Sequence, residues 1–343
     1  MALGPLLLDL EGQSLTAEER EILRDPRVGG VILFSRNYES RAQIATLTAA
    51  IHALRSPRLL ITVDHEGGRV QRFRAGFTVL PPAAAFGQAF DAAPEAALYL
   101  AEEAGWLLAA ELRAVGVDFS FAPVLDLAAC ASHVIGDRAF HASPHAVSRL
   151  AQAVLRGMRE AGMAAVGKHF PGHGSVAADS HHELPVDPRP YAEIRAADLI
   201  PFHHLAQRGI DAIMPAHVLY PAVDAVPPGF SRRWIQGVLR DELGFSGVVV
   251  SDDLSMAGAG GMGTPAERAT AALAAGCDLL LVCNDRPAAL AVLASQPTAP
   301  NPINQVRFMR LHGRGPIPTD ADLFADPRWL AARDQLARLL PPV

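Results

Sequence analysis

Short apolar runs recur along the chain, and longer stretches separate them in which apolar residues follow helical spacing. The runs do not alternate between apolar and polar residues but are apolar throughout, which is typical of strands buried on both faces of a sheet. Eight such runs are present, at residues 5–10, 28–34, 59–64, 119–126, 164–169, 212–217, 248–253 and 278–283. The pattern predicts eight parallel strands.

The intervening stretches carry apolar residues at i, i+3 and i+4, the spacing of one face of a helix. They cover residues 16–24, 41–54, 95–115, 145–161, 191–208, 232–243 and 265–275, and a further stretch at 287–294 follows the last run. Thr16 precedes an acidic first turn, and Thr264 precedes Pro265, so both are candidate N-caps. We therefore expect eight helices in alternation with the eight strands.

This alternation predicts an α/β fold in the form of a single (β/α)8 TIM-type barrel. An open, doubly wound sheet is the alternative, but it would normally carry a glycine-rich phosphate turn after the first strand. The segment Asp9-Leu10-Glu11-Gly12 fits such a turn poorly. We expect residues 1–343 to form one domain, with residues from about 300 to 343 packing on the barrel as a C-terminal tail.

The amino-acid composition limits the kinds of protein to which the chain can belong. Half of the residues are apolar and 19% are charged, which suits a large core, and the net charge of -6 provides no basic surface for nucleic acid. The N-terminal apolar run has neither the basic flank of a signal peptide nor the length of a membrane span. Cys130, Cys277 and Cys283 are not clustered like metal ligands, and we interpret them as reduced thiols. We therefore expect a cytoplasmic monomer or weak dimer that has no membrane association.

The candidate chemistry lies where the predicted strands end. In a barrel, these carboxyl ends meet at one face, where the active site lies. Ionisable residues end or follow five of the runs: Asp64, Glu66, Arg69 and Arg72, then Asp126 and Arg138, then Lys168 and His169, then His217, and finally Asp252 and Asp253. Carboxylates, guanidinium groups and imidazoles are suited to bind sugar hydroxyl groups, which both donate and accept hydrogen bonds.

Residues 164–183 are the densest part of this chemistry, because they carry four histidines, a lysine and an aspartate. Cleavage of a glycosidic bond with retention needs a nucleophile and a proton donor on opposite sides of the bond. Asp252, at the end of a buried run, is a candidate nucleophile. His181 is a candidate general acid and base, since Asp179 can orient its ring and favour its protonated form. From spacing alone, such a pair is more often a loop hydrogen bond than a catalytic pair.

The motifs around these residues resemble those of glycoside hydrolase family 3. The segments are Lys168-His169-Phe170-Pro171-Gly172-His173-Gly174, Ser251-Asp252-Asp253-Leu254-Ser255-Met256, Gly136-Asp137-Arg138-Ala139-Phe140, and Asp64-x-Glu66-Gly67-Gly68-Arg69-Val70-Gln71-Arg72. The Asp179-Ser180-His181 segment is similar to the one found in the β-N-acetylhexosaminidase branch of that family. The resemblance extends over residues 5–285.

This resemblance implies a retaining hydrolase that forms a covalent glycosyl-enzyme intermediate. It implies Asp252 as the nucleophile and His181, paired with Asp179, as the acid and base. The positions expected to hold the sugar are Asp64, Arg72, Arg138, Lys168 and His169. The implied substrate is a terminal β-1,4-linked N-acetylglucosamine on an anhydro-muropeptide, and the implied setting is peptidoglycan recycling. No cofactor and no metal are expected.

Two departures from the family pattern leave questions open. Position 65 is His where Gln is commoner in the family motif. In addition, His182 directly follows His181, so His182 competes with His181 for the acid and base role on motif grounds. The sequence alone also leaves open whether Asp252 or Asp253 attacks.

Three alternative functions remain at this point. His169, His173, His181 and Asp179 could serve a zinc hydrolase, which a chelator would test. A histidine acid adds no negative charge against an incoming anion, so the enzyme could be a phosphorylase, which phosphate dependence would reveal. The third alternative is a barrel that binds sugars without cleaving them.

Overall fold

The computed structural model describes residues 2–129, 134–176, 180, 183–296 and 301–340. All eight predicted strands form one parallel sheet in the order β10-β1-β2-β3-β6-β7-β8-β9. They are β1 (Leu6–Asp9), β2 (Val28–Leu33), β3 (Leu60–Val63), β6 (Phe119–Ser120), β7 (Ala164–Phe170), β8 (Ala212–Pro215), β9 (Val248–Val249) and β10 (Leu280–Val282). A bridge between Val250 and Leu279 joins the two ends of the sheet. The predicted (β/α)8 barrel is confirmed.

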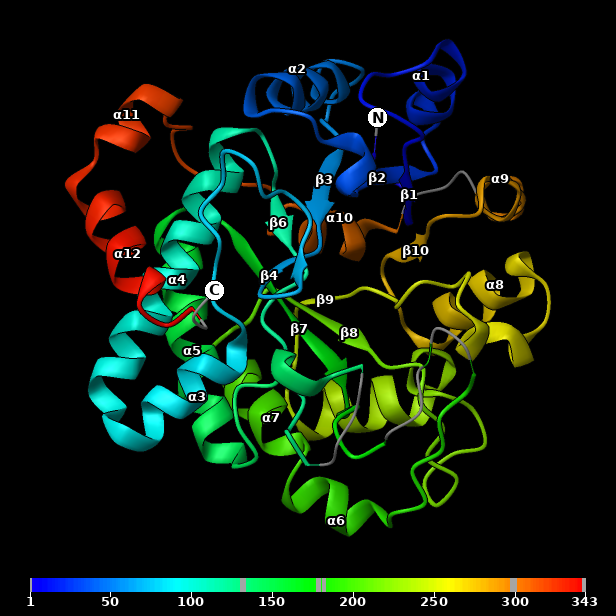
Figure 1. Cartoon of the computed structure of the whole chain (residues 1–343). Coiled ribbons are helices and arrows are strands. Elements are labelled where there is room, and N and C mark those ends of the chain that lie inside the picture. The colour runs from blue at the N-terminus through cyan, green and yellow to red at the C-terminus, as the bar shows by residue number, and fades with distance from the viewer. Residues whose placement is uncertain (1, 130–133, 177–179, 181–182, 297–300, 341–343) are drawn as a thin grey trace.

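Helices follow each strand and surround the sheet (Figure 1). They are α1 (Ala17–Arg24), α2 (Arg41–His52), α3 (Ala83–Ala92), α4 (Pro94–Ala114), α5 (Pro144–Glu160), α6 (Tyr191–Ala196), α7 (Leu199–Gln207), a π-type helix over Arg233–Glu242, α8 (Pro265–Ala275) and α9 (Arg286–Ser295). The predicted caps are confirmed, because Thr16 caps α1 and Thr264 caps α8, each in a reciprocal pair with a glutamate three residues on.

The structure departs from the expected helices in two places. Helix α3 was not expected, since its alanine-rich sequence shows little periodicity. The expected helix at 191–208 is divided into α6 and α7. Asp198 lies at this break, and its carboxylate accepts a hydrogen bond of 2.8 Å from Nη1 of Arg189. This hydrogen bond connects the break between α6 and α7 to the loop before α6.

A short antiparallel hairpin, which the sequence pattern did not predict, stands directly after β3. It consists of β4 (His65–Gly67) and β5 (Val70–Gln71). Gly67 and Gly68 at its turn have positive φ angles, and a Cβ on Gly67 would lie 2.6 Å from the carbonyl of Pro81. The hairpin therefore needs glycine here, and it places Glu66 at the end of the barrel where the strands terminate.

The C-terminal segment holds α10 (Pro302–Phe308), α11 (Asp320–Ala325) and α12 (Pro327–Ala337). Figure 1 shows α11 and α12 beside α4. The indole N–H of Trp329 donates to Oε1 of Glu111 over 2.8 Å, and both side chains are buried.

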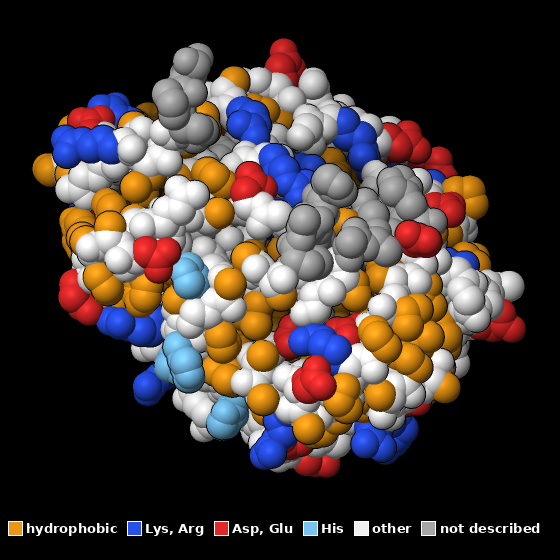
Figure 2. Space-filling view, turned by 60° about the horizontal axis from the view of Figure 1, so that its bottom comes forward, with side chains coloured by type: hydrophobic (Ala, Val, Ile, Leu, Met, Phe, Trp, Pro, Cys, Tyr) orange, Lys and Arg blue, Asp and Glu red, His pale blue; other side chains and the backbone are white. Residues whose placement is uncertain are grey.

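No helix within the described ranges is both long and apolar enough to cross a membrane. Acidic and basic side chains are interspersed over the face seen in Figure 2.

Candidate active site

A cavity of about 530 Å3 opens at the carboxyl ends of the barrel strands. Loops at this end form the ligand site in barrels of this type. Its ionisable lining consists of Asp64, Glu66, Arg69, Arg72, Arg138, Lys168, His169, His173, Asp252 and Asp253. Its apolar lining includes Ile32, Phe34, Phe121, Met214, Met256 and Leu281. The structure thus brings ionisable groups that follow four of the predicted strands into one space.

Lys168 and Glu66 form the buried base of the cavity. Nζ of Lys168 lies 2.6 Å from Oε1 of Glu66 and 3.0 Å from Oδ1 of Asp64. Arg138 contacts the same glutamate through two bonds, with Nε 2.9 Å from Oε2 and Nη2 2.8 Å from Oε1. Burial alone would raise the pKa of Glu66, but the charges of Arg138 and Lys168 outweigh it and hold that pKa far below its usual range.

Glu66 was expected among the ionisable residues at the strand ends, but no role was predicted for it. Its spacing could have indicated one, because it stands two residues after Asp64. Its two cations, however, lie 72 and 102 positions further along the chain, and only the fold brings them together. As a common acceptor, Glu66 fixes Arg138 and Lys168 in place and compensates their positive charges.

Asp64 and Arg72 lie beside this buried base, and both side chains are partly exposed. Nη2 of Arg72 lies 3.5 Å from Oδ2 of Asp64, and the guanidinium carbon lies 5.7 Å from the centre of the Phe34 ring. Nε of Arg72 is buried and has no hydrogen-bond partner among the described residues. An unpaired buried donor costs free energy unless a ligand or water satisfies it, so this atom is suited to bind one.

Asp126 is a completely buried carboxylate that organises two histidines. Its Oδ2 lies 2.7 Å from Nδ1 of His169, and its Oδ1 accepts the backbone N–H of His169 over 3.2 Å and of His173 over 2.7 Å. Burial raises the pKa of Asp126, but the histidines outweigh this effect and the pKa lies below its ordinary value. Because Nδ1 of His169 is engaged with Asp126, its Nε2 remains to face a ligand.

The two neighbouring aspartates of the seventh strand have different surroundings. Asp253 accepts hydrogen bonds from the backbone N–H and hydroxyl of Ser255 and from the backbone N–H and thiol of Cys283. Burial raises its pKa. Asp252 lines the cavity, is less buried, and accepts the backbone N–H of Asp253 over 2.8 Å. Both carboxyl groups line the cavity, but that of Asp253 is occupied by hydrogen bonds that join two strand ends.

His217 does not line the cavity. Its Nε2 lies 3.0 Å from the carbonyl oxygen of Asp253, and its ring stacks on Phe230 at 5.7 Å between centres. Asp179, His181 and His182, three of the expected catalytic or competing groups, lie outside the described residues, as does Cys130. Ser180 is described: it is buried and lines the cavity.

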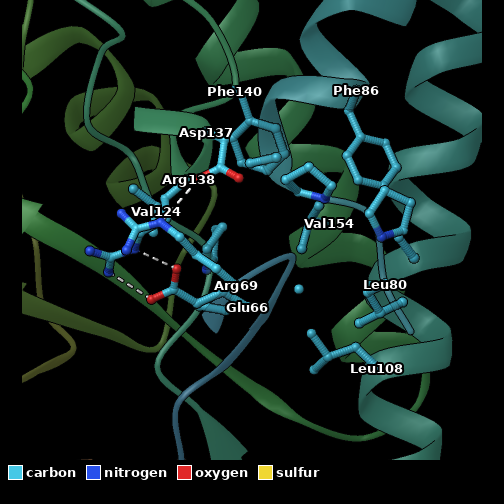
Figure 3. A pocket seen from close by; sticks show the side chains of 18 residues that line it. Glu66, Arg69, Leu80, Phe86, Leu108, Val124, Asp137, Arg138, Phe140 and Val154 are labelled. Atoms are coloured by element: carbon cyan, nitrogen blue, oxygen red, sulfur yellow. Dashed lines mark hydrogen bonds and ion pairs between the residues drawn. The ribbon is translucent and has the colours of Figure 1, made fainter. Parts of the chain in front are cut away.

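A second, smaller pocket lies against the first one and is seen in Figure 3. Glu66, Arg69 and Arg138 line both. Asp137 also lines it, and the rest of its lining is apolar and includes Leu80, Phe86, Leu108, Phe140 and Val154; its volume is about 40 Å3. Such a space is about that of one water molecule, so a sugar ring fits only the larger cavity. Within the described ranges, no group of three or more His, Cys, Asp or Glu side chains could hold a metal ion.

The chain is similar to known proteins over its whole length. A model of the glycosyl hydrolase family 3 N terminal domain matches residues 7–309. A Beta-hexosaminidase of Thioalkalivibrio sulfidiphilus is 57% identical over 97% of this chain and 95% of its own, and one of Nitrosospira multiformis is 54% identical over 98% and 97%. The crystal structure of native NagZ from Neisseria gonorrhoeae superposes with a TM-score of 0.94 at 44% identity, covering 100% of this chain and 99% of that one.

Proposed function

We propose that this chain, which belongs to glycosyl hydrolase family 3 and is a β-N-acetylhexosaminidase of that family, removes terminal N-acetylglucosamine with retention of configuration. The main observation behind the proposal is that Asp252, Asp64, Lys168 and His169 line the same cavity, which is large enough for a sugar ring. A relative supports the choice of sugar, because NagZ from Neisseria gonorrhoeae has been crystallised in complex with N-trifluoroacetyl-D-glucosamine.

The sugar would be held by the groups at the base of the cavity. Asp64 and Nε2 of His169, whose Nδ1–H is directed at Asp126, accept hydrogen bonds from hydroxyl groups, while Arg72 and Lys168 donate them. Arg138 lies at the same base and, through its two bonds to Glu66, keeps the cationic side of the site rigid. Preorganised groups of this kind bind a charged or distorted transition state without reorganising during the reaction.

The reaction would proceed in two displacements. An oxygen of Asp252 attacks the anomeric carbon, the bond to the leaving oxygen breaks, and His181 donates its proton to that oxygen. Water then attacks the anomeric carbon, gives a proton to His181, and releases the carboxylate of Asp252. Asp179 would orient His181 and stabilise its charged form. Two inversions at one carbon leave the configuration retained. The roles of His181 and Asp179 rest on the motif resemblance.

The natural substrate would be an anhydro-muropeptide that carries a terminal β-1,4-linked N-acetylglucosamine. Its release would be a step of peptidoglycan recycling in the cytoplasm, with the enzyme acting as a monomer or weak dimer. We also take residues 1–343 as one domain, since the C-terminal helices pack on α4 through Trp329 and Arg328. The resemblance supports this substrate and setting.

Hydrolysis of two aryl glycosides tests the proposal. Wild type should cleave an aryl β-N-acetylglucosaminide far faster than the matching aryl β-glucoside, and Asp252→Ala should cleave neither at a measurable rate. Equal rates on the two sugars would contradict the substrate class. Full activity of Asp252→Ala would contradict the assignment of the nucleophile.

A further inference from the structure

We infer that Asp253 carries a proton in the folded enzyme at neutral pH and, as a neutral group, positions the neighbouring Asp252. The consequence for catalysis rests on the proposed function, in which Asp252 attacks the sugar. The structural basis is the number of protons available to the oxygen atoms that meet where β10 ends beside the segment that follows β9.

Two acceptor oxygens compete for one proton at Ser255. Its hydroxyl oxygen lies 2.8 Å from Oδ2 of Asp253 and 2.8 Å from the carbonyl oxygen of Cys283. A hydroxyl group has a single proton to donate. If Asp253 is ionised, that proton serves one of the two contacts and the other has none. If Oδ2 carries a proton, Asp253 donates to Ser255 and Ser255 donates to Cys283. Only the protonated form gives each short contact its own proton.

The remaining contacts of the Asp253 carboxyl group fit the protonated form. Its Oδ1 accepts the backbone N–H of Ser255 over 2.9 Å and that of Cys283 over 3.2 Å. Sγ of Cys283 lies 2.9 Å from Oδ2, and a thiol is a weak donor. A protonated carboxyl group has one O–H donor and keeps acceptor capacity. Oδ2 can therefore accept the thiol proton while its own proton is directed at Ser255.

No cation compensates a charge on Asp253, although the side chain is buried. Within the described part of the chain, the contacts of its carboxyl group come from Ser255 and Cys283, and none comes from a lysine, arginine or histidine. Glu66, the buried carboxylate at the base of the same cavity, has two cationic partners instead. A buried carboxylate without a cation tends to take up a proton. Asp253 thus has the surroundings of a neutral group.

The other ionisable groups around Asp253 do not favour its charge. Nε2 of His217, at the end of β8, lies 3.0 Å from the backbone carbonyl of Asp253 and does not contact its carboxyl group. Burial raises the pKa of Asp253, and this effect exceeds that of its hydrogen bonds. The remaining ionisable neighbours are Asp252, the Cys283 thiol and, beyond that thiol, Asp9 and Asp64. Each of these three carboxylates would repel a second negative charge.

A neutral Asp253 assists the nucleophile in two ways. Its backbone N–H donates to Oδ1 of Asp252 over 2.8 Å, and the bonds at its side chain and at its carbonyl restrict the direction of that N–H. A negative charge next to Asp252 would raise the pKa of the nucleophile and lower its ionised fraction. Protonated Asp253 therefore holds the backbone in place without adding that charge.

The pH dependence of stability tests for the proton on Asp253 without any assay of activity. An unfolded aspartate ionises near about pH 3.9, whereas Asp253 in the folded wild type should keep its proton. Above that pH the folded chain binds one proton more than the unfolded chain, so stability falls as pH rises. Asp253→Asn is neutral in both states. From about pH 4.5 to 7, we expect the unfolding equilibrium constant of wild type to rise relative to that of Asp253→Asn, by up to about tenfold per pH unit.

Asp25→Asn is the control for this comparison. The hydrogen bond with Arg27, over 2.6 Å, lowers the pKa of Asp25. Above about pH 5, Asp25 is therefore ionised in the folded and in the unfolded chain. The ratio of the unfolding constants of wild type and Asp25→Asn should stay level over that range.

The pH profile of kcat/KM gives a readout that a purely structural role would not affect. Its acid limb reports the pKa of the nucleophile in the free enzyme. Asp253→Asn replaces one neutral group with another, so the acid limb should stay at the pH of wild type. If Asp253 were ionised, the change would remove a negative charge beside Asp252, and the acid limb would move to lower pH.

Neutron diffraction from a deuterium-exchanged crystal of wild type at neutral pH needs no variant. It should show one deuteron on Oδ2 of Asp253, directed at the hydroxyl oxygen of Ser255, and a second directed from that hydroxyl to the carbonyl of Cys283. The absence of a deuteron on Asp253 would overturn the inference.

A ratio of unfolding constants of wild type and Asp253→Asn that stays level or falls with rising pH would also overturn the inference, as would a shifted acid limb. These results leave the proposed function intact. A wild-type enzyme that cleaves no aryl β-N-acetylglucosaminide would instead contradict the proposed function, and the stability comparison would still decide whether Asp253 is protonated.

Discussion

The ammonium group of Lys168 lies 2.6 Å from a carboxylate oxygen of Glu66, and both side chains are almost completely buried. Arg138 contacts the same carboxylate, so one glutamate compensates two cations at the base of the cavity. A buried charge that loses its partner costs several kcal/mol. The sugar-binding cations therefore depend on a residue that need not touch the sugar.

Glu66→Gln should destabilise the fold and weaken catalysis together. The change leaves Lys168 and Arg138 with one negative charge fewer in a buried site. We expect the free energy of unfolding to fall by about 3 kcal/mol and kcat/KM by at least about 10-fold, measured by denaturant unfolding and by aryl glycoside hydrolysis. Glu160→Gln is the control, because this exposed glutamate also pairs with an arginine and should cost under about 1 kcal/mol. Equal effects of both changes would contradict this account.

Substitution of Asp252 should mainly lower activity, whereas substitution of Asp253 should mainly lower stability. Asp252→Ala should lower kcat by at least about 10³-fold, because a nucleophile is lost, with little change in the free energy of unfolding. Asp253→Ala leaves the donors of Ser255 and Cys283 without their acceptor, so it should cost about 2–4 kcal/mol of that free energy. Kinetics and denaturant unfolding of both variants test this. If Asp253→Ala instead lost its activity while Asp252→Ala kept it, Asp253 would be the nucleophile.

His65 should make the fold sensitive to acid. Burial lowers its pKa to about 3, whereas an unfolded histidine titrates near about 6.5. Between these values the unfolded chain binds a proton that the folded chain does not, so stability falls as pH falls from about 6.5 to 3, by at most about 1.4 kcal/mol per pH unit. In His65→Gln this contribution is absent, and the stability should fall less steeply over that range. Identical slopes would contradict the lowered pKa of His65 in the fold.

Phosphate should not be a substrate. If water is the acceptor, the rate on an aryl β-N-acetylglucosaminide should be the same in phosphate-free buffer and at saturating phosphate, and the product should be the free sugar. Product analysis by mass spectrometry checks this outcome. A sugar 1-phosphate as the main product would favour the phosphorylase alternative.

The pattern of apolar runs predicted the barrel correctly because strands buried on both faces leave a clear signal. Boundaries were less accurate: the run at 119–126 forms a strand only over Phe119–Ser120. Beyond it, the chain still pairs with β7 through the backbone N–H of Leu125, which donates to the carbonyl of Lys168 over 2.6 Å. Irregular backbone of this kind leaves the same apolar pattern as a regular strand.

The site could be predicted in part, because its residues stand at strand ends and the fold dictates that strand ends meet. The role of Glu66 could not be predicted, since it depends on which rotamers and loops the packed barrel permits. The sequence pattern likewise did not separate Asp252 from Asp253. Their surroundings differ because Asp253 accepts hydrogen bonds from Ser255 and from Cys283, which the eighth strand brings alongside.

The covalent intermediate on Asp252 is the central claim, and trapping it is the most direct test. A fluorinated N-acetylglucosaminyl donor that slows the second displacement should add the mass of one sugar to the intact protein. After proteolysis, the sugar should be found on Asp252 and not on Asp253. An adduct on any other residue, or turnover of the natural linkage with inversion of configuration, would contradict the account.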